Sequence, residues 1–321
     1  MTFAKASVIV PAYNAAATIG ECLEAVLSQI YAGEVELIVV DDGSVDATAA
    51  VVRSYRGVKY VFQENRGPAS ARNRGAACAS GDLLLFTDSD CRPEPGWIQG
   101  MADGFQDDSV GVVAGSYAIA NEGMALPRII HGEIRFRHLR LMPSYPRVFG
   151  SYNFAVSADL FRHIGGFNAV YRQASGEDND LSYRILRSGR KIRFLKDVCV
   201  AHYHQHILWK YLREQFRHGF WRASLYLDHA SMAAGDDYTF WKDIVELPLA
   251  LGHVACLFWP PVFLAVLAVF LAFEGVFGLW LFGVSADGFL AGGVMWLRAF
   301  ARAAGFVFGG LDALRRKYGK G

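Results

Sequence analysis

Four short, mainly apolar runs shape the first part of the chain, and each is followed at once by polar residues. The runs are 6–10, 35–40, 58–62 and 83–87, and segments with apolar residues at helical spacing separate them. Short apolar runs without strict alternation are typical of strands that are buried on both faces. Strands that alternate with helices predict a parallel, doubly wound α/β sheet. We therefore expect this part of the chain to form one such sheet.

The fourth run leads directly into Asp88-Ser89-Asp90. In an open α/β sheet, the carboxyl ends of the strands form the edge at which ligands bind. Two carboxylates held there need a cation between them, or one of them must keep its proton. Carboxylate and phosphate oxygens together suit Mg²⁺ or Mn²⁺. The stretch therefore predicts a divalent cation that bridges to a diphosphate, and the alternative is a solvated turn rich in aspartate.

Polar clusters also follow the other three strands. They comprise Pro11, Tyr13 and Asn14 after the first strand, Asp41 after the second, and Asn65 and Gly67 after the third. Tyr13 can stack on a base. Asp41 can accept a hydrogen bond from a base N–H, which selects uracil or thymine over cytosine. Arg72, in the next helix, can reach a phosphate or pair with Asp88. Each residue also has an ordinary role in packing or turns, but their order along the chain favours a nucleotide pocket.

The second half of the chain is less regular. We expect a strand at 110–114, helices at 159–164 and 177–186, and short strands at 191–195 and 198–201, whereas 120–150 carries no clear pattern. This organisation predicts four parts. They are a nucleotide-binding half at 1–110, an acceptor-binding half at 111–205, a helical connector at 206–245 and membrane-associated helices at 246–321.

Charge and cysteine content narrow the class of protein. The formal net charge is +1, which gives no argument for nucleic-acid binding. The five cysteines are scattered and lack metal-site spacing, so we interpret them as reduced thiols. The N-terminus shows no signal-peptide pattern, which predicts that the N-terminal domain stays in the cytoplasm.

An apolar segment begins near the C-terminal third of the chain. No Asp, Glu, Lys or Arg lies between Glu246 and Glu274, and a bilayer crossing needs about 20 apolar residues. Either one helix crosses at about 261–284, or an interfacial hairpin pivots at Pro260-Pro261; a buried hairpin in a soluble protein is the third possibility. The tail is a basic amphipathic pattern that suits a surface of anionic lipids. Because positive residues tend to stay cytoplasmic, the tail favours the hairpin. We therefore predict association of 246–321 with the cytoplasmic face of the cell membrane.

Several ordered motifs connect these observations. They are Val8–Asn14, Val40–Asp46, Asn65–Gly67, Ala71–Asn73, Asp88–Asp90, Gly165–Phe167 and Gly176–Asp178. As a series over about 6–205, they resemble the family 2 glycosyltransferases, which have the GT-A fold. The resemblance implies transfer of a sugar from a nucleotide diphosphate with inversion at the anomeric carbon. It also implies a base that deprotonates the acceptor hydroxyl, and a divalent metal that stabilises the departing diphosphate.

The resemblance also assigns roles to individual residues. It implies that Asp90 is the metal ligand, with His202 as a possible second ligand. It implies that Asp88 and Ser89 contact the donor and that Asp178 is the base. On the acceptor side it points to Asn153, Gly166 and Glu177.

The motif of processive relatives, Gln-x-x-Arg-Trp, is absent, because the sequence here is Gln215-Phe216-Arg217-His218-Gly219. Arg217 could still approach the diphosphate. The departure predicts a non-processive enzyme.

These inferences lead to one main hypothesis and two alternatives. The main hypothesis is a membrane-associated glycosyltransferase that moves a sugar, from UDP as first choice, to a lipid-linked or other membrane-proximal acceptor. The first alternative is a catalytically silent member that binds a nucleotide sugar or scaffolds a membrane complex. The second is a sugar-phosphate nucleotidyltransferase, but such enzymes carry a Gly-rich loop where this chain has Pro11-Ala12-Tyr13-Asn14.

Overall fold

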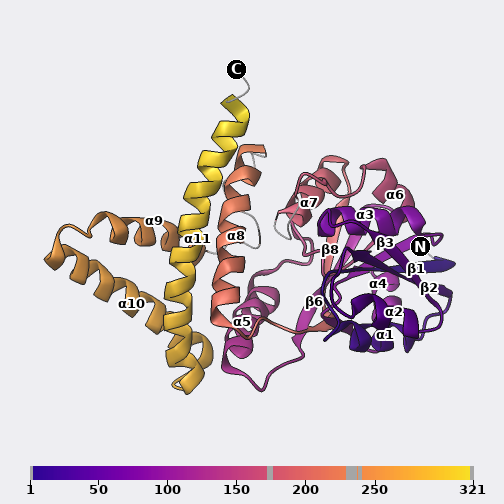
Figure 1. Ribbon diagram of the computed structural model, residues 1–321, viewed down its shortest axis with the longest axis horizontal. Helices are drawn as coiled ribbons and strands as arrows, with labels where there is room; N and C mark the ends of the chain where they lie inside the picture. Colours follow the sequence, from indigo (N-terminus) through magenta and orange to yellow (C-terminus); the bar gives the residue numbers. More distant parts are fainter. Residues whose placement is uncertain (1–2, 172–175, 229–236, 238–240, 319–321) are drawn as a thin grey trace. The chain divides into compact units, whose positions relative to one another are not determined.

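The structure, a computed structural model, describes all residues except 1–2, 172–175, 229–236, 238–240 and 319–321 (Figure 1). The chain divides into two compact units. The first unit comprises 1–120 and 138–203, and the second comprises 121–137 and 204–321.

The first unit is an α/β domain. Its strands are β1 (Lys5–Ala12), β2 (Glu34–Asp42), β3 (Val58–Gln63), β4 (Leu83–Thr87), β5 (Cys91–Pro93), β6 (Val110–Ile119), β7 (Asn153–Ser157) and β8 (Lys191–His202). Its helices are α1 (Ile19–Leu27), α2 (Thr48–Ser54), α3 (Pro68–Cys78), α4 (Trp97–Asp103), α6 (Ala158–His163) and α7 (Glu177–Arg187). A π-helical turn, Arg137–Leu141, leads back into this unit.

The strands form one mixed sheet in the order β3-β2-β1-β4-β7-β6-β8-β5. The strands β3, β2, β1 and β4 are parallel, as the alternation of strands and helices predicts. The next strand, β7, is antiparallel to both β4 and β6, and therefore the sheet is not parallel throughout. The result is a mostly parallel sheet with an irregular second half.

Side chains of the central strand alternate between two cores. Leu83 and Leu85 belong to the core that α1 and α4 cover, whereas Leu84 and Phe86 belong to the core that α3, α6 and α7 cover. Successive side chains of a strand point to opposite faces, so a strand buried on both faces must be apolar at every position. The Phe86 ring stacks on Phe154 of β7 with a centroid distance of 4.6 Å. The uninterrupted apolar run of β4 is thus the consequence of its central place.

The last strand differs from its expected form. The sequence predicts two short strands, but β8 is one strand from Lys191 to His202 with a register shift opposite Gly115 and Ser116 of β6. A β-bulge keeps strand pairing while it changes the direction of the strand. The bulge lets β8 continue as far as His202.

The second unit is helical. It contains α5 (Ala125–Phe136), α8 (Leu208–Asp228), α9 (Trp241–Ala255), α10 (Pro260–Phe282) and α11 (Ala286–Tyr318). The helices α10 and α11 are long and apolar enough to cross a membrane, by length and composition alone. No regular element was expected at 125–136, although α5 has one strongly apolar face. The three prolines and many basic residues of 120–150 obscured that face.

A buried ionic network joins four helices of the second unit. Its four acids and four bases are Glu133 on α5, Arg137 directly after α5, Lys242, Asp243 and Glu246 on α9, Glu274 on α10, and Arg298 and Arg302 on α11. Lys242 Nζ lies 2.6 Å from Glu274 Oε2, and Arg298 Nη2 lies 2.7 Å from Glu246 Oε1. Buried charges are tolerated when each has a partner, and these eight charges balance.

The network predicts a large effect for one substitution. Lys242→Met removes the cation that Glu246 and Glu274 share, and it should destabilise the second unit by about 3–5 kcal/mol because two buried carboxylates lose a partner. The exposed pair Lys5–Glu34 offers the control, since Lys5→Met should cost less than about 1 kcal/mol. Six of the seven tryptophans lie in the second unit, so denaturant unfolding followed by tryptophan emission reports on it. Equal unfolding midpoints for the two variants would contradict the prediction.

Candidate active site

The predicted strand-end residues meet at one edge of the first unit. Because β1, β2, β3 and β4 are parallel, their carboxyl ends lie along the same edge of the sheet. Ala12 of β1 pairs with Asp41 of β2, and Asp41 pairs with Phe62 of β3. Pro11 is buried at the end of β1. The residues after these strands therefore become neighbours, as the sequence predicts.

Asp42 organises this edge, a role that the sequence analysis did not assign. Its side chain accepts hydrogen bonds from the backbone N–H groups of Arg66 (2.9 Å) and Gly67 (2.8 Å). Its carbonyl oxygen accepts a bond from the Asn65 amide at 3.0 Å. Gly67 has φ 90°, a left-handed conformation that favours glycine. The loop before α3 is thus held by a carboxylate at the end of β2, and the adjacent Asp-Asp pair was the available signal.

Asp41, near the end of β2, pairs with Ala12, the residue before Tyr13. Asp41 is buried and accepts bonds from the Ser44 N–H (2.8 Å) and the Tyr60 hydroxyl (2.7 Å). Burial and this bond raise the pKa of Tyr60 to about 12, which keeps Tyr60 a donor. Tyr13 is 53% exposed, so its ring is open to a stacking partner. Asn14 accepts a bond from the Val45 N–H, which ties the two loops together.

Arg72 links two of the predicted site carboxylates. Its side chain is buried, with Nη2 2.7 Å from Asp88 Oδ1 and Nη1 3.1 Å from Glu177 Oε1. The Arg72 guanidinium also lies 5.4 Å from the centre of the Phe167 ring. Pairing with Asp88 was one of the two roles considered for Arg72, and the contact to Glu177 was not expected. The segments predicted to hold the donor and the base, far apart in the sequence, therefore share the buried Arg72 side chain.

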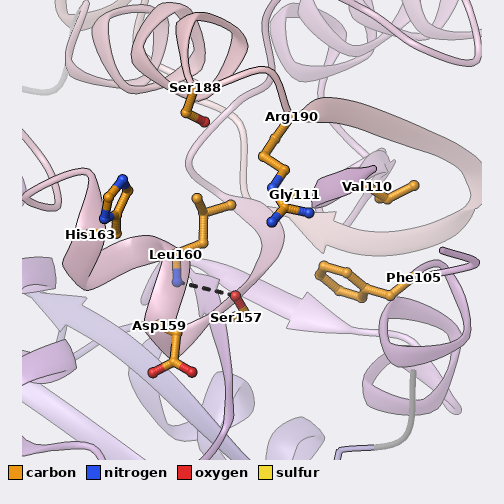
Figure 2. Close-up of a pocket in the computed structure, with 9 residues that line it drawn as sticks. All are labelled: Phe105, Val110, Gly111, Ser157, Asp159, Leu160, His163, Ser188 and Arg190. Atoms are coloured by element: carbon orange, nitrogen blue, oxygen red, sulfur yellow. Dashed lines mark hydrogen bonds between the residues drawn. The ribbon is translucent and has the colours of Figure 1, made fainter. Parts of the chain in front are cut away.

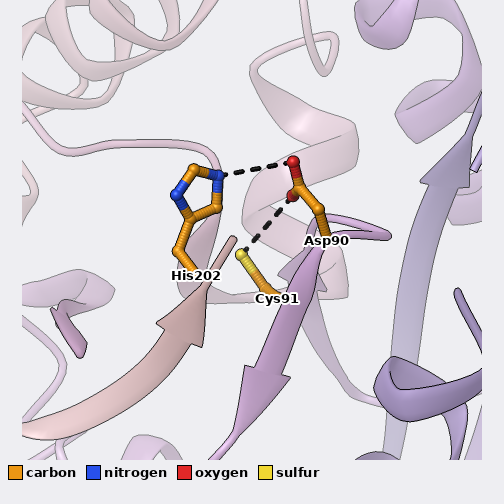
Figure 3. A group of neighbouring side chains, drawn as sticks. All are labelled: Asp90, Cys91 and His202. Atoms are coloured by element: carbon orange, nitrogen blue, oxygen red, sulfur yellow. Dashed lines mark hydrogen bonds and ion pairs between the residues drawn. The ribbon is translucent and has the colours of Figure 1, made fainter. Parts of the chain in front are cut away.

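Asp90, His202 and Cys91 form a compact group beside Asp88 (Figure 3). Asp90 Oδ2 lies 3.4 Å from His202 Nε2, and ligand atoms of the three residues lie within 4.8 Å of one another. The strand β8 brings His202 here because Cys91 of β5 pairs with His202. Burial opposes ionisation of Asp90, but the contact with His202 outweighs it and lowers the pKa of Asp90. Burial raises the pKa of Cys91 well above its ordinary value, so its thiol stays neutral.

An aromatic stack supports His202, and no sequence motif indicated it. The Tyr117 ring lies 4.8 Å from the His202 ring and stacks on Tyr152 with a centroid distance of 3.6 Å. The Tyr152 hydroxyl lies 3.2 Å from His138 Nε2, and His138 Nδ1 lies 2.9 Å from the Ser116 hydroxyl. A histidine held on one side by stacked rings has few orientations available. Alternation along β6 places Tyr117 on this face.

Asp178 is the second residue of α7 and directly follows Glu177. A left-handed Gly176, with φ 91°, precedes the helix. Carboxylates are favoured in the first turn of a helix, where the backbone dipole is positive. Asp178 is half-buried, and its Oδ1 accepts a bond from the N–H of Asn179 at 2.9 Å. The Arg72–Glu177 contact fixes the helix start beside Asp88.

Two other predicted residues, Gly166 and Asn153, have structural contacts. Gly166 has φ 64° and lies against Asn73, whose amide bonds both backbone polar groups of Phe167. Asn153 is fully buried, and its amide bonds Trp97, Ser116 O and Val198 O. These bonds do not favour an acceptor contact for Asn153, and that role stays a prediction. Ser89 is half-buried beside Asp88, and Arg217 lies on α8 of the second unit. Their roles also stay predictions.

Glu177 should make the stability of the first unit depend on pH. Burial and the charge of Asp178 raise the pKa of Glu177 to about 7, although Arg72 opposes the shift. A carboxyl whose pKa is raised in the folded state contributes stability below its unfolded pKa and loses it as pH rises through the folded value. Relative to the wild-type protein, the unfolding free energy of Glu177→Gln should therefore be higher at about pH 8 than at about pH 5. Exposed Glu64→Gln is the control, and parallel curves for both variants would contradict the prediction.

A separate hollow of about 490 Å³ lies at the other edge of the sheet (Figure 2). Its lining includes Ser157, Leu160 and Arg190. Ser157 pairs with Leu83 at the amino end of β4, whereas Asp88 follows the carboxyl end. The hollow is therefore not part of the site at Asp88 and Asp90.

Comparison with known proteins agrees with this geometry. The family model described as glycosyl transferase family 2 matches residues 7–178, which include every strand-end cluster described above and Asp178. The chain belongs to this family. The protein is therefore a glycosyltransferase that uses a nucleotide sugar.

Two curated relatives show the extent of the similarity. Glycosyltransferase AglE of Haloferax volcanii is 31% identical, over 66% of this chain and 71% of the relative. Pre-mycofactocin glycosyltransferase of Mycobacterium tuberculosis is 28% identical, over 69% of this chain and 49% of the relative. The second match therefore spans about half of that relative's length.

Solved structures confirm the GT-A fold. Mannosyltransferase PcManGT of Pyrobaculum calidifontis, in complex with GDP-Man and Mn²⁺, has a TM-score of 0.57 at 21% identity, covering 100% of this chain and 89% of that one. Glucosyl-3-phosphoglycerate synthase of Mycobacterium tuberculosis, with Mn²⁺ and UDP, has a TM-score of 0.51 at 23% identity, covering 69% and 79%.

Proposed function

We propose that this glycosyltransferase transfers a sugar, with inversion, from a nucleoside diphosphate to a hydroxyl of a lipid-linked or other membrane-proximal acceptor. The observation that carries the proposal is the buried Arg72, which joins Asp88 on the donor side to Glu177 beside Asp178. Inversion requires a base on the face of the sugar opposite the leaving group. The Arg72 guanidinium holds the segment of Asp88 and the segment of Glu177 and Asp178 at the same strand end. Such a transfer requires this arrangement of donor site and base.

The donor side has the groups that a nucleoside diphosphate needs. The exposed ring of Tyr13 offers a stacking surface for a base. Asp41, which pairs with Ala12 next to Tyr13, supports a uracil base because its carboxylate is an acceptor. Asp88 and Ser89 would contact the ribose or sugar, and Asn65 and Gly67 would line the pocket. A UDP-sugar is therefore the first choice of donor.

Asp90 and His202 fit a divalent cation. Their carboxylate oxygen and imidazole nitrogen face each other, and both are metal ligands in proteins. A carboxylate suits Mg²⁺ and Mn²⁺, whereas an added imidazole favours Mn²⁺. Neutral Cys91 contributes no charge to this site. When bound, such a cation would stabilise negative charge on the departing diphosphate.

On the acceptor side, Asp178 would take the proton of the attacking hydroxyl. Arg72 and Glu177 hold the start of α7, so the Asp178 carboxylate keeps its direction. Gly166 and the loop that Asn73 secures would line the same side. A diphosphate contact by Arg217 stays a prediction. The membrane-proximal acceptor is supported by the apolar helices of 246–321, which would keep the enzyme in the plane of its substrate on the cytoplasmic face.

Donor binding by the purified protein tests this proposal. UDP-, GDP- and dTDP-sugars are compared by calorimetry, each with and without Mn²⁺. We expect metal-dependent binding of one donor and its transfer to an acceptor in membrane extract. Binding without turnover would favour the silent, scaffolding alternative. No binding of any donor would contradict the nucleotide pocket, and formation of a nucleotide sugar from a sugar phosphate would favour the nucleotidyltransferase alternative.

A further inference from the structure

The outer surface of α10 is apolar along its whole length. Exposed side chains recur from Val262 through Val269 and Val276 to Trp280, and the connection before α10 exposes Leu257, Phe258 and Trp259. Phe258 is 91% exposed. The opposite side of α10 is buried and packs on α9 and α11. Such a surface fits acyl chains, and tryptophans at its ends fit the border between lipid and water.

The ionic network limits how deeply α10 can enter a membrane. Glu274 lies three residues from Leu271, the midpoint of Pro260–Phe282, which is about 5 Å along a helix axis. If α10 crossed a bilayer along its length, Glu274 would lie close to the middle of the hydrocarbon. Lys242, Glu246 and Arg298 would lie at the same depth, because they form one chain of contacts with Glu274.

The network also includes α5, which cannot lie at that depth. Glu133 of α5 pairs with Arg298, and Arg137, directly after α5, pairs with Asp243. Arg135, between them, is exposed, and a charged side chain exposed to lipid at the bilayer centre costs about 2.5–3.5 kcal/mol or more. A crossing by α10 would therefore draw the exposed charge of Arg135 into the hydrocarbon.

The helix α11 is restricted independently, by α8. A Cβ at Gly305 would lie 2.0 Å from Phe216 O, and one at Gly309 would lie 2.0 Å from Phe220 O, so the two backbones are in close contact. The helix α8 carries five charged side chains of both signs in 210–222, among them the exposed Lys210 and Arg213. The C-terminal half of α11 must share the environment of this charged helix, which excludes the hydrocarbon core.

From these contacts we infer that the second unit enters the membrane from one side only and that neither α10 nor α11 crosses it. The inference rests on the membrane association in the proposed function and adds its topology. The outer face of α10 and the connection at 256–259 are embedded in one leaflet. The ionic network lies at the level of the headgroups, where water and lipid phosphates screen its outer members.

Cysteine labelling of the two connections that flank α10 tests the inference. Phe258→Cys lies before α10, and Val284→Cys, at a position 88% exposed, lies after it. The full chain is expressed in bacterial spheroplasts and treated with a membrane-impermeant maleimide, before and after permeabilisation. The wild-type chain, with its own five cysteines, supplies the background. We expect labelling of both variants above this background only after detergent treatment.

The outcomes distinguish a failure of the inference from a failure of the proposed function on which it rests. Labelling of one of the two cysteines in sealed spheroplasts would place the ends of α10 on opposite sides and overturn the inference. Labelling of both cysteines in sealed spheroplasts would agree with an α10 that does not cross the membrane, but it would overturn the cytoplasmic location of the enzyme. Recovery of the wild-type chain in the soluble fraction, without detergent, would overturn membrane association itself.

Discussion

Asp178→Asn should leave donor binding unchanged and reduce sugar transfer by about 100- to 10,000-fold, because a positioned general base contributes a factor of that size. The asparagine keeps the size of the side chain at the start of α7 but cannot accept the proton of the acceptor hydroxyl. Binding is measured by titration with the donor, and transfer by the release of nucleoside diphosphate in the presence of acceptor. A fall in kcat with an unchanged donor dissociation constant is the expected signature.

A second helix offers a matched control for this substitution. Asp159 occupies the first turn of α6, as Asp178 does in α7, but it is exposed and pairs only with Arg162 in the described contacts. Asp159→Asn removes the same charge from a comparable position and should leave both binding and transfer unchanged. If Asp178→Asn keeps the transfer rate of Asp159→Asn, then Asp178 is a helix-start aspartate and not the base.

Asp90→Ala should abolish the metal dependence of donor binding and weaken binding in Mn²⁺ by more than about 10-fold. Loss of a group that merely supports a metal ligand commonly costs 10- to 100-fold, so loss of the ligand should cost at least as much. Chelation of the metal from the wild-type protein should produce the same binding defect. The measurement is calorimetric titration of the donor with Mn²⁺ and with a chelator.

Asp82 is the matched control, since it precedes β4 as Asp90 follows it. Asp82 is exposed and lies at the opposite edge of the sheet, so Asp82→Ala should retain metal-dependent binding. His202→Ala should show an intermediate defect, because Asp90 would remain. Metal-dependent binding by Asp90→Ala equal to that of Asp82→Ala would contradict the assignment of Asp90.

The nucleotide-binding half was predictable because its structure is local and repetitive. Each strand is a short apolar run and each is followed by a helix, so the order of elements alone defines parallel strands with adjacent ends. Asp88, Asp90 and Asp41 follow strand ends in the sequence and therefore lie at the strand-end edge in the structure. The contact between Arg72 and Asp88 follows from the same logic, since α3 precedes β4.

The second half was less predictable because its contacts are long-range. The strand β7 pairs with β4 across some 70 residues, and its antiparallel direction is not encoded in Asn153–Ser157 alone. Tyr117, Tyr152 and His138 come from three separate segments, so no motif could reveal their stack under His202. The helix α5 has an amphipathic pattern, but Glu133 on it and Arg137 directly after it are buried in partnerships with α11 and α9. Read locally, those charges indicate a solvated segment.

The sequence by itself determined the family, the parallel strands and the carboxylates at their ends, because each depends on residues that are close along the chain. Only the tertiary structure decided that Glu177 shares Arg72 with Asp88 and that His202 reaches Asp90. It also decided that eight charged residues form one buried network beside the apolar helix α10. The physical reason is that a buried charge is defined by its partner, and these partners lie far apart in the sequence.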